Sequence, residues 1–138
     1  LWLNQGAIVY TVDRRGSLGG FDSTRSALTD APLVVLVNGG TASASEILAG
    51  ALQDNHRALL VGEKTFGKGL IQSLFDLSDG AGLAVTVAHY ETPNHTDINK
   101  QGIMPDRIVK SPNLMRSQLA TEADPQYQEG VDLLRYQM

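Results

Sequence analysis

The stretch "PLVVLVNGGTASASEILAGALQDN", residues 32–55, predicts a strand, a glycine turn and a helix in succession. Its first part, Pro32 to Val37, is rich in Val and Leu, which is typical of a strand buried on both faces. After Gly39-Gly40, apolar residues recur at the helical positions 47, 48, 51 and 52, and Asn55 is a plausible C-terminal helix signal. The stretch therefore predicts an α/β fold.

The flanking segments extend this pattern. Ala7 to Val12 and Ala58 to Val61 are apolar and predict strands, and the polar, glycine-containing stretch from Arg14 to Thr29 predicts a loop. Leu70 to Leu77 and Gly82 to Tyr90 alternate around "SDGAG", which predicts a hairpin.

The C-terminal segment predicts a second helix. Asp124-Pro125 is a typical helix start, and the residues that follow form one apolar stripe: Tyr127, Val131 and Leu134. We expect this helix to dock back onto the rest of the chain.

The composition narrows the function classes. With 138 residues, 42% of them hydrophobic and 19% charged, the chain is long enough for one globular unit. A formal net charge of −4 argues against nucleic-acid binding, and the absence of cysteine excludes disulfides and thiol catalysis. No aliphatic run approaches the roughly 20 residues of a membrane-spanning helix. The chain starts Leu-Trp-Leu without an initiator Met, so we expect it to be part of a longer precursor.

A lysine between two glycines raises the question of a phosphate loop. The segment "GEKTFGKGLIQ", residues 62–72, fits G-x-x-x-x-G-K, but Gly69 stands where such a loop needs Ser or Thr. The following "LIQSLFDL" alternates like a strand and does not open a helix. A phosphate ligand is thus a poor interpretation of Lys68, and a solvated turn lysine is the plain alternative.

The segment "NGGTASASE", residues 38–46, has the pattern of a nucleophile elbow, in which a hydroxyl is presented at a helix N-terminus. Ala42 and Ala44 leave room for a substrate backbone, and first-turn amides have no intrahelical partner, which suits an oxyanion hole. However, Ser43 and Glu46 also have the S-x-x-E spacing of a capping box, and Thr41 or Ser45 could cap the helix. The segment alone leaves both interpretations open.

A serine nucleophile needs a base, and the histidines are weak candidates. His56 lies past the helix end, about 20 Å from Ser43 along the axis. His89 falls in a strand pattern and His95 in a polar turn, and no metal-binding histidine pair is present, so we interpret all three as structural or solvated. Asp54 is about 16 Å from Ser43, and we expect it to cap the helix or pair with Arg57.

Lys68 is the remaining candidate base. It accepts a proton only when neutral, which requires burial among apolar groups. Three neighbours could supply that burial: Phe66, Leu70 and Ile71. Gln72 could orient the amine, although in a straight strand it would lie about 13 Å from Lys68, so contact needs a bend at Gly69.

The run from Pro32 to Pro93, with "TASASE" followed by "TFGKG", and then "DINKQGIMPD", closely resembles the carboxyl-terminal processing peptidases, or tail-specific proteases. The resemblance covers about residues 32–109. It implies a serine peptidase in which Ser43 is the nucleophile, Lys68 the general base and Gln72 the residue that orients the lysine. The backbone N–H of Ala44 would be one oxyanion donor. It implies neither a metal nor a cofactor.

The resemblance also implies an α/β fold on the crotonase-like (ClpP/crotonase-type) plan, and cleavage near the C-termini of protein substrates through an acyl-enzyme. An upstream PDZ domain engages the substrate tail in this family, and the segment that supplies the second oxyanion donor would fall before Leu1. We therefore expect residues 1–110 to be the C-terminal part of the catalytic domain and residues 111–138 an extension with a docking helix. Alone, the chain is expected to be inactive or very weak.

"TDINKQGIMPD" is similar to the photosynthetic branch, which implies the thylakoid lumen, whereas bacterial relatives work in the periplasm. Asn94-His95 stands where relatives often have glycine. Two alternatives remain: a catalytically silent binding or scaffold domain of the same fold, and a nucleotide-binding loop protein.

Overall fold

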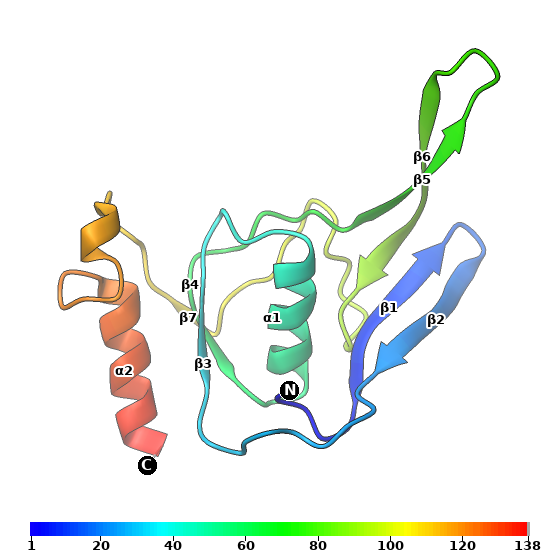
Figure 1. The fold of residues 1–138 in the computed structure, drawn as a ribbon. Coiled ribbons are helices and arrows are strands. Elements are labelled where there is room, and N and C mark those ends of the chain that lie inside the picture. The colour runs from blue at the N-terminus through cyan, green and yellow to red at the C-terminus, as the bar shows by residue number, and fades with distance from the viewer. Residues whose placement is uncertain (138) are drawn as a thin grey trace.

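The computed structural model describes residues 1–137 and contains two sheets (Figure 1). The four-stranded antiparallel sheet has the order β2-β1-β6-β5 and consists of β1 (Ala7–Asp13), β2 (Gly16–Asp22), β5 (Leu70–Asp76) and β6 (Gly82–Glu91). The three-stranded parallel sheet has the order β3-β4-β7 and consists of β3 (Val34–Val37), β4 (Leu59–Gly62) and β7 (Arg107–Ile108). The helices are α1 (Ala44–Asp54), α2 (Pro125–Gln137) and the short 3-10 helix η1 (Arg116–Gln118).

The predicted strand, glycine turn and helix form the centre of the molecule. β3 leads through the turn into α1, and the chain returns as β4, which pairs with β3 in parallel. Helix α1 lies between the two sheets (Figure 1) and contacts β1 on one side and β4 on the other. Four buried residues, Val37, Ala49, Leu60 and Ile103, form the core beneath the turn. This packing fixes the N-terminal end of α1, where Ser43 lies.

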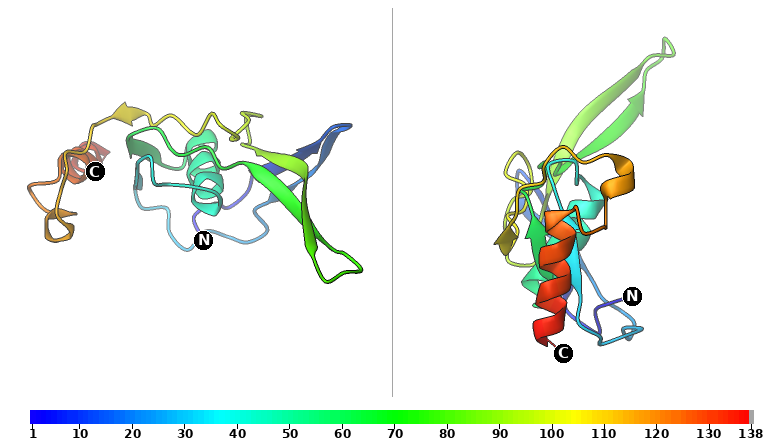
Figure 2. Two further views of the ribbon diagram at one scale, coloured as in Figure 1. Left: turned by 90° about the horizontal axis from the view of Figure 1, so that it is seen from above. Right: turned by 90° about the vertical axis from the view of Figure 1, so that its left-hand side faces the viewer.

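The predicted C-terminal helix is confirmed. It begins at Pro125, directly after Asp124, whose carboxylate accepts the backbone N–H of Gln126 at 3.0 Å. The helix runs alongside β3 (Figure 2) and contacts both β3 and β4. Gly130 packs closely against β3, because a Cβ at this position would lie 3.3 Å from the side chains of Val34 and Leu36.

The predicted hairpin is also confirmed, and it projects from the body of the molecule (Figures 1 and 2). Its strands carry several exposed apolar side chains: Leu74, Phe75, Leu83, Val85 and Val87. None of the helices in residues 1–137 is long and apolar enough to cross a membrane.

Two sequence expectations are wrong. The stretch from Arg14 to Thr29 is not all loop, because residues 16–22 form β2 and pair with β1. All seven residues of β2 are exposed, so pairing with β1 forms this strand without a hydrophobic pattern. β3 is not buried on both faces either. Val37 is buried, but Leu36 is 41% exposed.

Candidate active site

Ser43 is the N-cap residue of α1 and has an unusual backbone conformation. Its φ of 58° and ψ of −121° lie outside the regions that residues with a side chain normally occupy. Its hydroxyl makes no cap hydrogen bond. A strained serine at the start of a helix, with its hydroxyl uncommitted, has the geometry of a nucleophile elbow. The backbone N–H of Ser43 does donate to the Glu46 carboxylate, which is one of the two hydrogen bonds of a capping box.

The Glu46 carboxylate is fully buried and joins two segments of the chain. Its Oε2 accepts the backbone N–H of Ser43 at 2.9 Å and the backbone N–H of Lys68 at 2.8 Å. Its Oε1 accepts the N–H of Gly67 at 2.7 Å and the hydroxyl of Thr65 at 2.5 Å. One buried carboxylate thus holds the Ser43 turn against the loop that carries Lys68.

The charge on Glu46 is stabilised by these bonds. Burial raises its pKa, and this is the largest single effect, but the hydrogen bonds together outweigh it and the pKa lies below the ordinary value of 4.5. The hydroxyl of Thr65 contributes most, followed by the N–H groups of Lys68, Gly67 and Ser43. Glu46 is therefore an anion at neutral pH, with all its partners provided by the two segments that it joins.

The lysine loop is held from its other side by residues 98–103. The C=O of Gly67 accepts the N–H of Lys100 at 2.9 Å, and the N–H of Thr65 donates to the C=O of Ile103 at 3.1 Å. A Cβ on Gly69 would lie 2.6 Å from the backbone nitrogen of Asn99. The glycines flanking Lys68 are needed because two backbone segments approach closely here.

A further bond links the two segments directly, since the N–H of Phe66 donates to the C=O of Thr41 at 2.9 Å.

At the start of α1, the N–H of Ala44 donates to no group in residues 1–137, as expected for the first residue of a helix. This N–H next to Ser43 is therefore not used by a hydrogen bond within the part of the chain that the structure describes.

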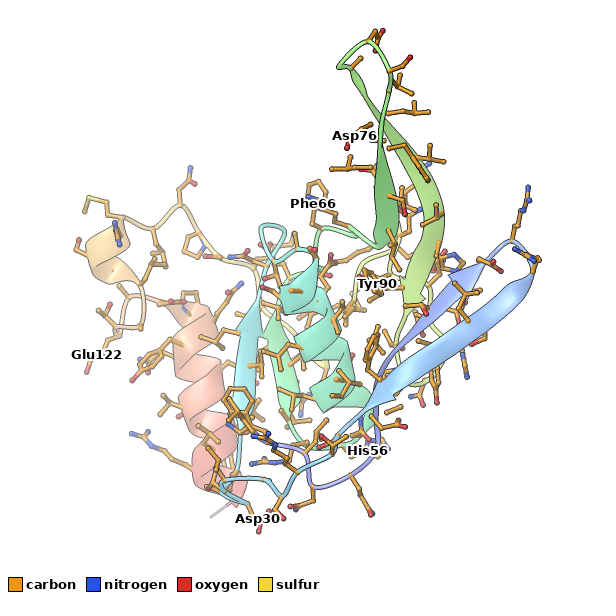
Figure 3. The ribbon with its side chains drawn as sticks, turned by 45° about the vertical axis from the view of Figure 1, so that its right-hand side comes forward. Asp30, His56, Phe66, Asp76, Tyr90 and Glu122 are labelled. Carbon is orange, nitrogen blue, oxygen red and sulfur yellow. The ribbon has the colours of Figure 1, made fainter. Side chains whose placement is uncertain are left out.

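The side chains of Lys68 and Gln72 are exposed, and neither makes a hydrogen bond within residues 1–137. The expectation that Phe66 and Leu70 bury the lysine is wrong for this chain, because Phe66 is 65% and Leu70 43% exposed. Figure 3 shows Phe66 at the outside of the loop near the start of α1. The structure therefore places the backbones of Ser43 and Lys68 together and leaves the lysine side chain exposed.

Asp54 lies at the far end of α1 from Ser43, as its sequence position predicts. Its predicted pairing with Arg57 is wrong. Its Oδ2 accepts the N–H of Asn94 at 2.8 Å, and Arg57 donates to backbone carbonyls, among them that of Trp2 at 3.0 Å. Asp54 thus ties the turn after β6 to the end of α1.

The histidines lie away from Ser43. His89 and His95 both contact the carboxylate of Glu91, at 3.3 and 3.0 Å, and the ring of His95 stacks on Tyr10. His56 follows the C-terminal end of α1 (Figure 3). Within residues 1–137 no group of three or more His, Cys, Asp or Glu residues is arranged to hold a metal. Lys68 is followed by the strand β5 and not by a helix, unlike the lysine of a phosphate loop.

Sequence reasoning missed two residues of this arrangement. It assigned Glu46 to a capping box, and the S-x-x-E spacing does point to its bond with Ser43. No local pattern shows that the same carboxylate reaches a loop 22 residues further along the chain. Thr65 gave no signal at all, although its buried hydroxyl bonds Glu46 and accepts the N–H of Ile103 at 2.7 Å.

Comparisons with known proteins show which family the chain resembles. The model of peptidase family S41 matches residues 1–109. A carboxyl-terminal-processing protease of Synechocystis is 66% identical over 134 residues, which are 97% of this chain and 31% of the relative. Carboxyl-terminal-processing peptidase 2 of Arabidopsis thaliana, described as chloroplastic, is 64% identical over 107 residues, 76% of this chain and 21% of the relative.

The fold matches solved structures. A photosystem II D1 C-terminal processing protease superposes with a TM-score of 0.78 at 47% identity, over 91% of this chain and 34% of that protein. A lipoprotein from Streptococcus agalactiae superposes with a TM-score of 0.74 at 19% identity, over 99% of this chain and 47% of that protein, which shows a shared fold. The chain spans about a third of the length of the processing proteases of Synechocystis and Picosynechococcus. The family match over residues 1–109 and the identity to these proteases show that the chain belongs to peptidase family S41.

Proposed function

We propose that the protein is a serine endopeptidase that cleaves protein substrates near their C-termini. Membership of family S41 and the names of the similar proteins, carboxyl-terminal-processing proteases, support this activity. Because the chain spans only part of these relatives, the activity is proposed for the complete protease.

In the proposed reaction, Ser43 Oγ attacks the carbonyl carbon of the scissile bond while the neutral amine of Lys68 takes its proton. The N–H of Ala44 donates to the developing oxyanion. The Lys68 ammonium then protonates the leaving amine, and the serine ester that remains is hydrolysed by water with Lys68 again as base. Gln72 orients the lysine amine, and no cofactor takes part.

The shared carboxylate of Glu46 carries this proposal. A lysine can act as the base for a serine only when the two residues are held in a fixed relative position. Oε2 of Glu46 accepts the backbone N–H of both Ser43 and Lys68. The strained conformation of Ser43 adds to it, because backbone strain of this kind clusters at functional sites. Glu46 therefore acts as a positioning residue for the Ser43–Lys68 pair.

The finer assignments follow from the family. The mixed α/β fold is proposed to follow the crotonase-like plan, with residues 1–110 in the catalytic domain and 111–138 as its extension. An upstream PDZ domain would capture the substrate tail, and a segment before Leu1 would supply a second oxyanion donor. The chloroplastic and cyanobacterial relatives favour the thylakoid lumen over the bacterial periplasm.

A catalytically silent domain of the same fold is the second candidate, and the exposed Lys68 favours it for the chain on its own. Labelling with a fluorophosphonate separates the two, because only an activated serine reacts. We expect mass spectrometry of the labelled complete protease to find the adduct on Ser43, with no labelling of Ser43→Ala. The matched control, Ser45→Ala, should label like the wild type. Labelling that persists in Ser43→Ala would contradict the proposed nucleophile.

A further inference from the structure

Strand β5 is an edge of the antiparallel sheet, and it begins two residues after Lys68. Its partner on one side is β6, and within residues 1–137 no strand pairs with its other side. An edge strand offers a row of backbone N–H and C=O groups to any extended chain that reaches it. The N-terminal end of this edge lies next to the candidate active site, because Leu70 follows Lys68 by two residues.

The hydrogen bonds at the two ends of β5 show which residues face outward. The C=O of Gly69 accepts the N–H of Tyr90 at 2.7 Å, and the N–H of Leu77 donates to the C=O of Ala81 at 2.8 Å. Antiparallel bonding alternates along a strand, so the odd-numbered residues of β5 bond to β6. The register shift does not disturb this alternation, because the additional residue, Val87, lies in β6. The residues whose backbone N–H and C=O groups point away from β6 are therefore Leu70, Gln72, Leu74 and Asp76.

Apolar side chains flank this edge on both faces of the hairpin. Leu74 is 80% exposed, on the face that it shares with Leu70, and Phe75 and Leu83 are exposed on the opposite face. Figure 3 shows the hairpin reaching from the loop at Phe66 outward past Asp76. Such a surface suits an extended segment with apolar side chains pointing to both faces.

We propose that β5 binds the substrate, which adds to the sheet as an antiparallel strand. This inference rests on the proposed protease function and names the part of the substrate that is recognised. β5 runs away from Lys68, so an antiparallel substrate runs towards the site and lays the residues N-terminal to the scissile bond along β5. The seven residues of β5 span about 20 Å, enough for about six substrate residues.

The mode of binding sets the substrate class. Main-chain hydrogen bonds to Gln72 and Leu74 depend little on sequence, whereas the exposed apolar residues favour aliphatic or aromatic side chains. The outer end of the strand carries Asp76, which disfavours acidic residues there. The predicted substrate is an extended, unfolded segment, apolar and free of acidic residues before the cleaved bond.

The test measures peptide binding by the complete protease carrying Ser43→Ala, so that turnover is not needed. A fluorescent peptide with a Leu- and Val-containing segment before its cleavage site is compared with versions that carry one N-methyl group at successive residues. N-methylation removes one donor, so Kd should rise about five- to tenfold at every second residue and change less at the residues between. The same alternation should appear in kcat/KM of the wild type.

Two variants of Leu74 distinguish the contribution of its backbone N–H to peptide binding from that of its side chain. Leu74→Pro removes an outward N–H without breaking a bond to β6, a place where edge strands tolerate proline. It should weaken binding about fivefold or more and remove the N-methyl effect at the paired residue. Leu74→Ala keeps the N–H and should retain that effect. Thermal unfolding of both variants checks that the hairpin is intact. The N-methyl peptide series is measured on a protein in which β5 is unchanged, so it tests the proposal even if a Leu74 variant does not fold.

The outcomes are distinct. An alternating N-methyl effect that Leu74→Pro removes supports the proposal. If the wild type binds the peptide in this way but does not cleave it, only the proposed protease function is contradicted. A uniform N-methyl effect, or peptide binding unchanged by Leu74→Pro, overturns the proposal. If Leu74→Pro instead changes the mass of the protein in solution without changing peptide binding, the edge pairs with a second copy and the proposal is wrong.

Discussion

The backbone N–H groups of Ser43 and Lys68 donate to the same carboxylate oxygen, Oε2 of Glu46, at 2.9 and 2.8 Å. These residues are 25 positions apart in the sequence, and the carboxylate that joins them is fully buried. Their relative position therefore depends on one charged group that takes no part in the proposed proton transfer.

The first prediction follows from this bond. Glu46→Gln keeps the size of the side chain, but one amide oxygen cannot replace two carboxylate oxygens that accept four donors. Buried donors are left without partners, so we expect a loss of about 2–4 kcal/mol in the free energy of unfolding, measured with urea. The kcat of the complete protease should fall at least about a hundredfold. Glu122→Gln makes the same exchange at an exposed glutamate and is the control, and equal effects of both variants would contradict the role of Glu46.

The lowered pKa of Glu46 predicts a loss of stability in acid. A carboxyl whose pKa is lower in the folded than in the unfolded protein stabilises the fold above the unfolded value, here the ordinary 4.5. That stabilisation is lost as the pH falls through the lower folded-state pKa. We expect the Tm to fall between about pH 5 and pH 2 and the slope to be shallower in Glu46→Gln. An unchanged slope would show that other carboxyls dominate.

A third prediction concerns the glycine after Lys68. In Gly69→Ala the new Cβ would lie 2.6 Å from the backbone nitrogen of Asn99, so one of the two backbone segments must move. We expect a loss of about 1–3 kcal/mol in stability and a lower kcat, because the movement carries Lys68 with it. Gly82→Ala is the matched control, because a Cβ added at Gly82 would meet no atom within 4 Å in residues 1–137 apart from its chain neighbours, and Gly82 starts a strand of the same hairpin. Equal stability of the two variants would contradict the tight packing at Gly69.

The fourth prediction tests whether Ser43 and Lys68 act as a unit. In the complete protease, Ser43→Ala and Lys68→Ala should each remove nearly all turnover, and the double variant should be no worse than either. Lys68→Arg should not restore activity, because a guanidinium stays protonated. Steady-state kcat/KM on a tail peptide is the measurement. Additive losses would show that the two residues serve different steps.

The sequence predicted the elements that local pattern determines. The apolar run before Gly39-Gly40, the helical spacing after it and the alternation of the hairpin are local patterns, and the structure confirms the strand, the helix and the hairpin, although not the burial of the strand on both faces. It did not predict β2, because glycines and exposed residues give no period and only the partner β1 makes the strand.

The candidate site was only partly predictable for the same reason. Ser43, Ala44 and Lys68 lie in recognisable local motifs. The bond from Glu46 to the lysine loop spans 22 residues and has no local signature. The exposure of Lys68 was also hidden, because apolar neighbours in the sequence predict burial only where another part of the protein covers them.

The last prediction concerns residues 1–138 alone. Lys68 is exposed here, so residues 1–137 do not supply the apolar surroundings that a lysine base needs. Of two oxyanion donors, only the N–H of Ala44 is expected in this chain, and one missing donor costs about 10² to 10³ in kcat. We therefore expect residues 1–138 to hydrolyse a C-terminal tail peptide at least about a thousandfold more slowly than the complete protease. The two proteins are compared at matched concentration, with circular dichroism as a control for folding of the shorter one. Comparable rates would show that residues 1–138 already contain every group that the reaction needs.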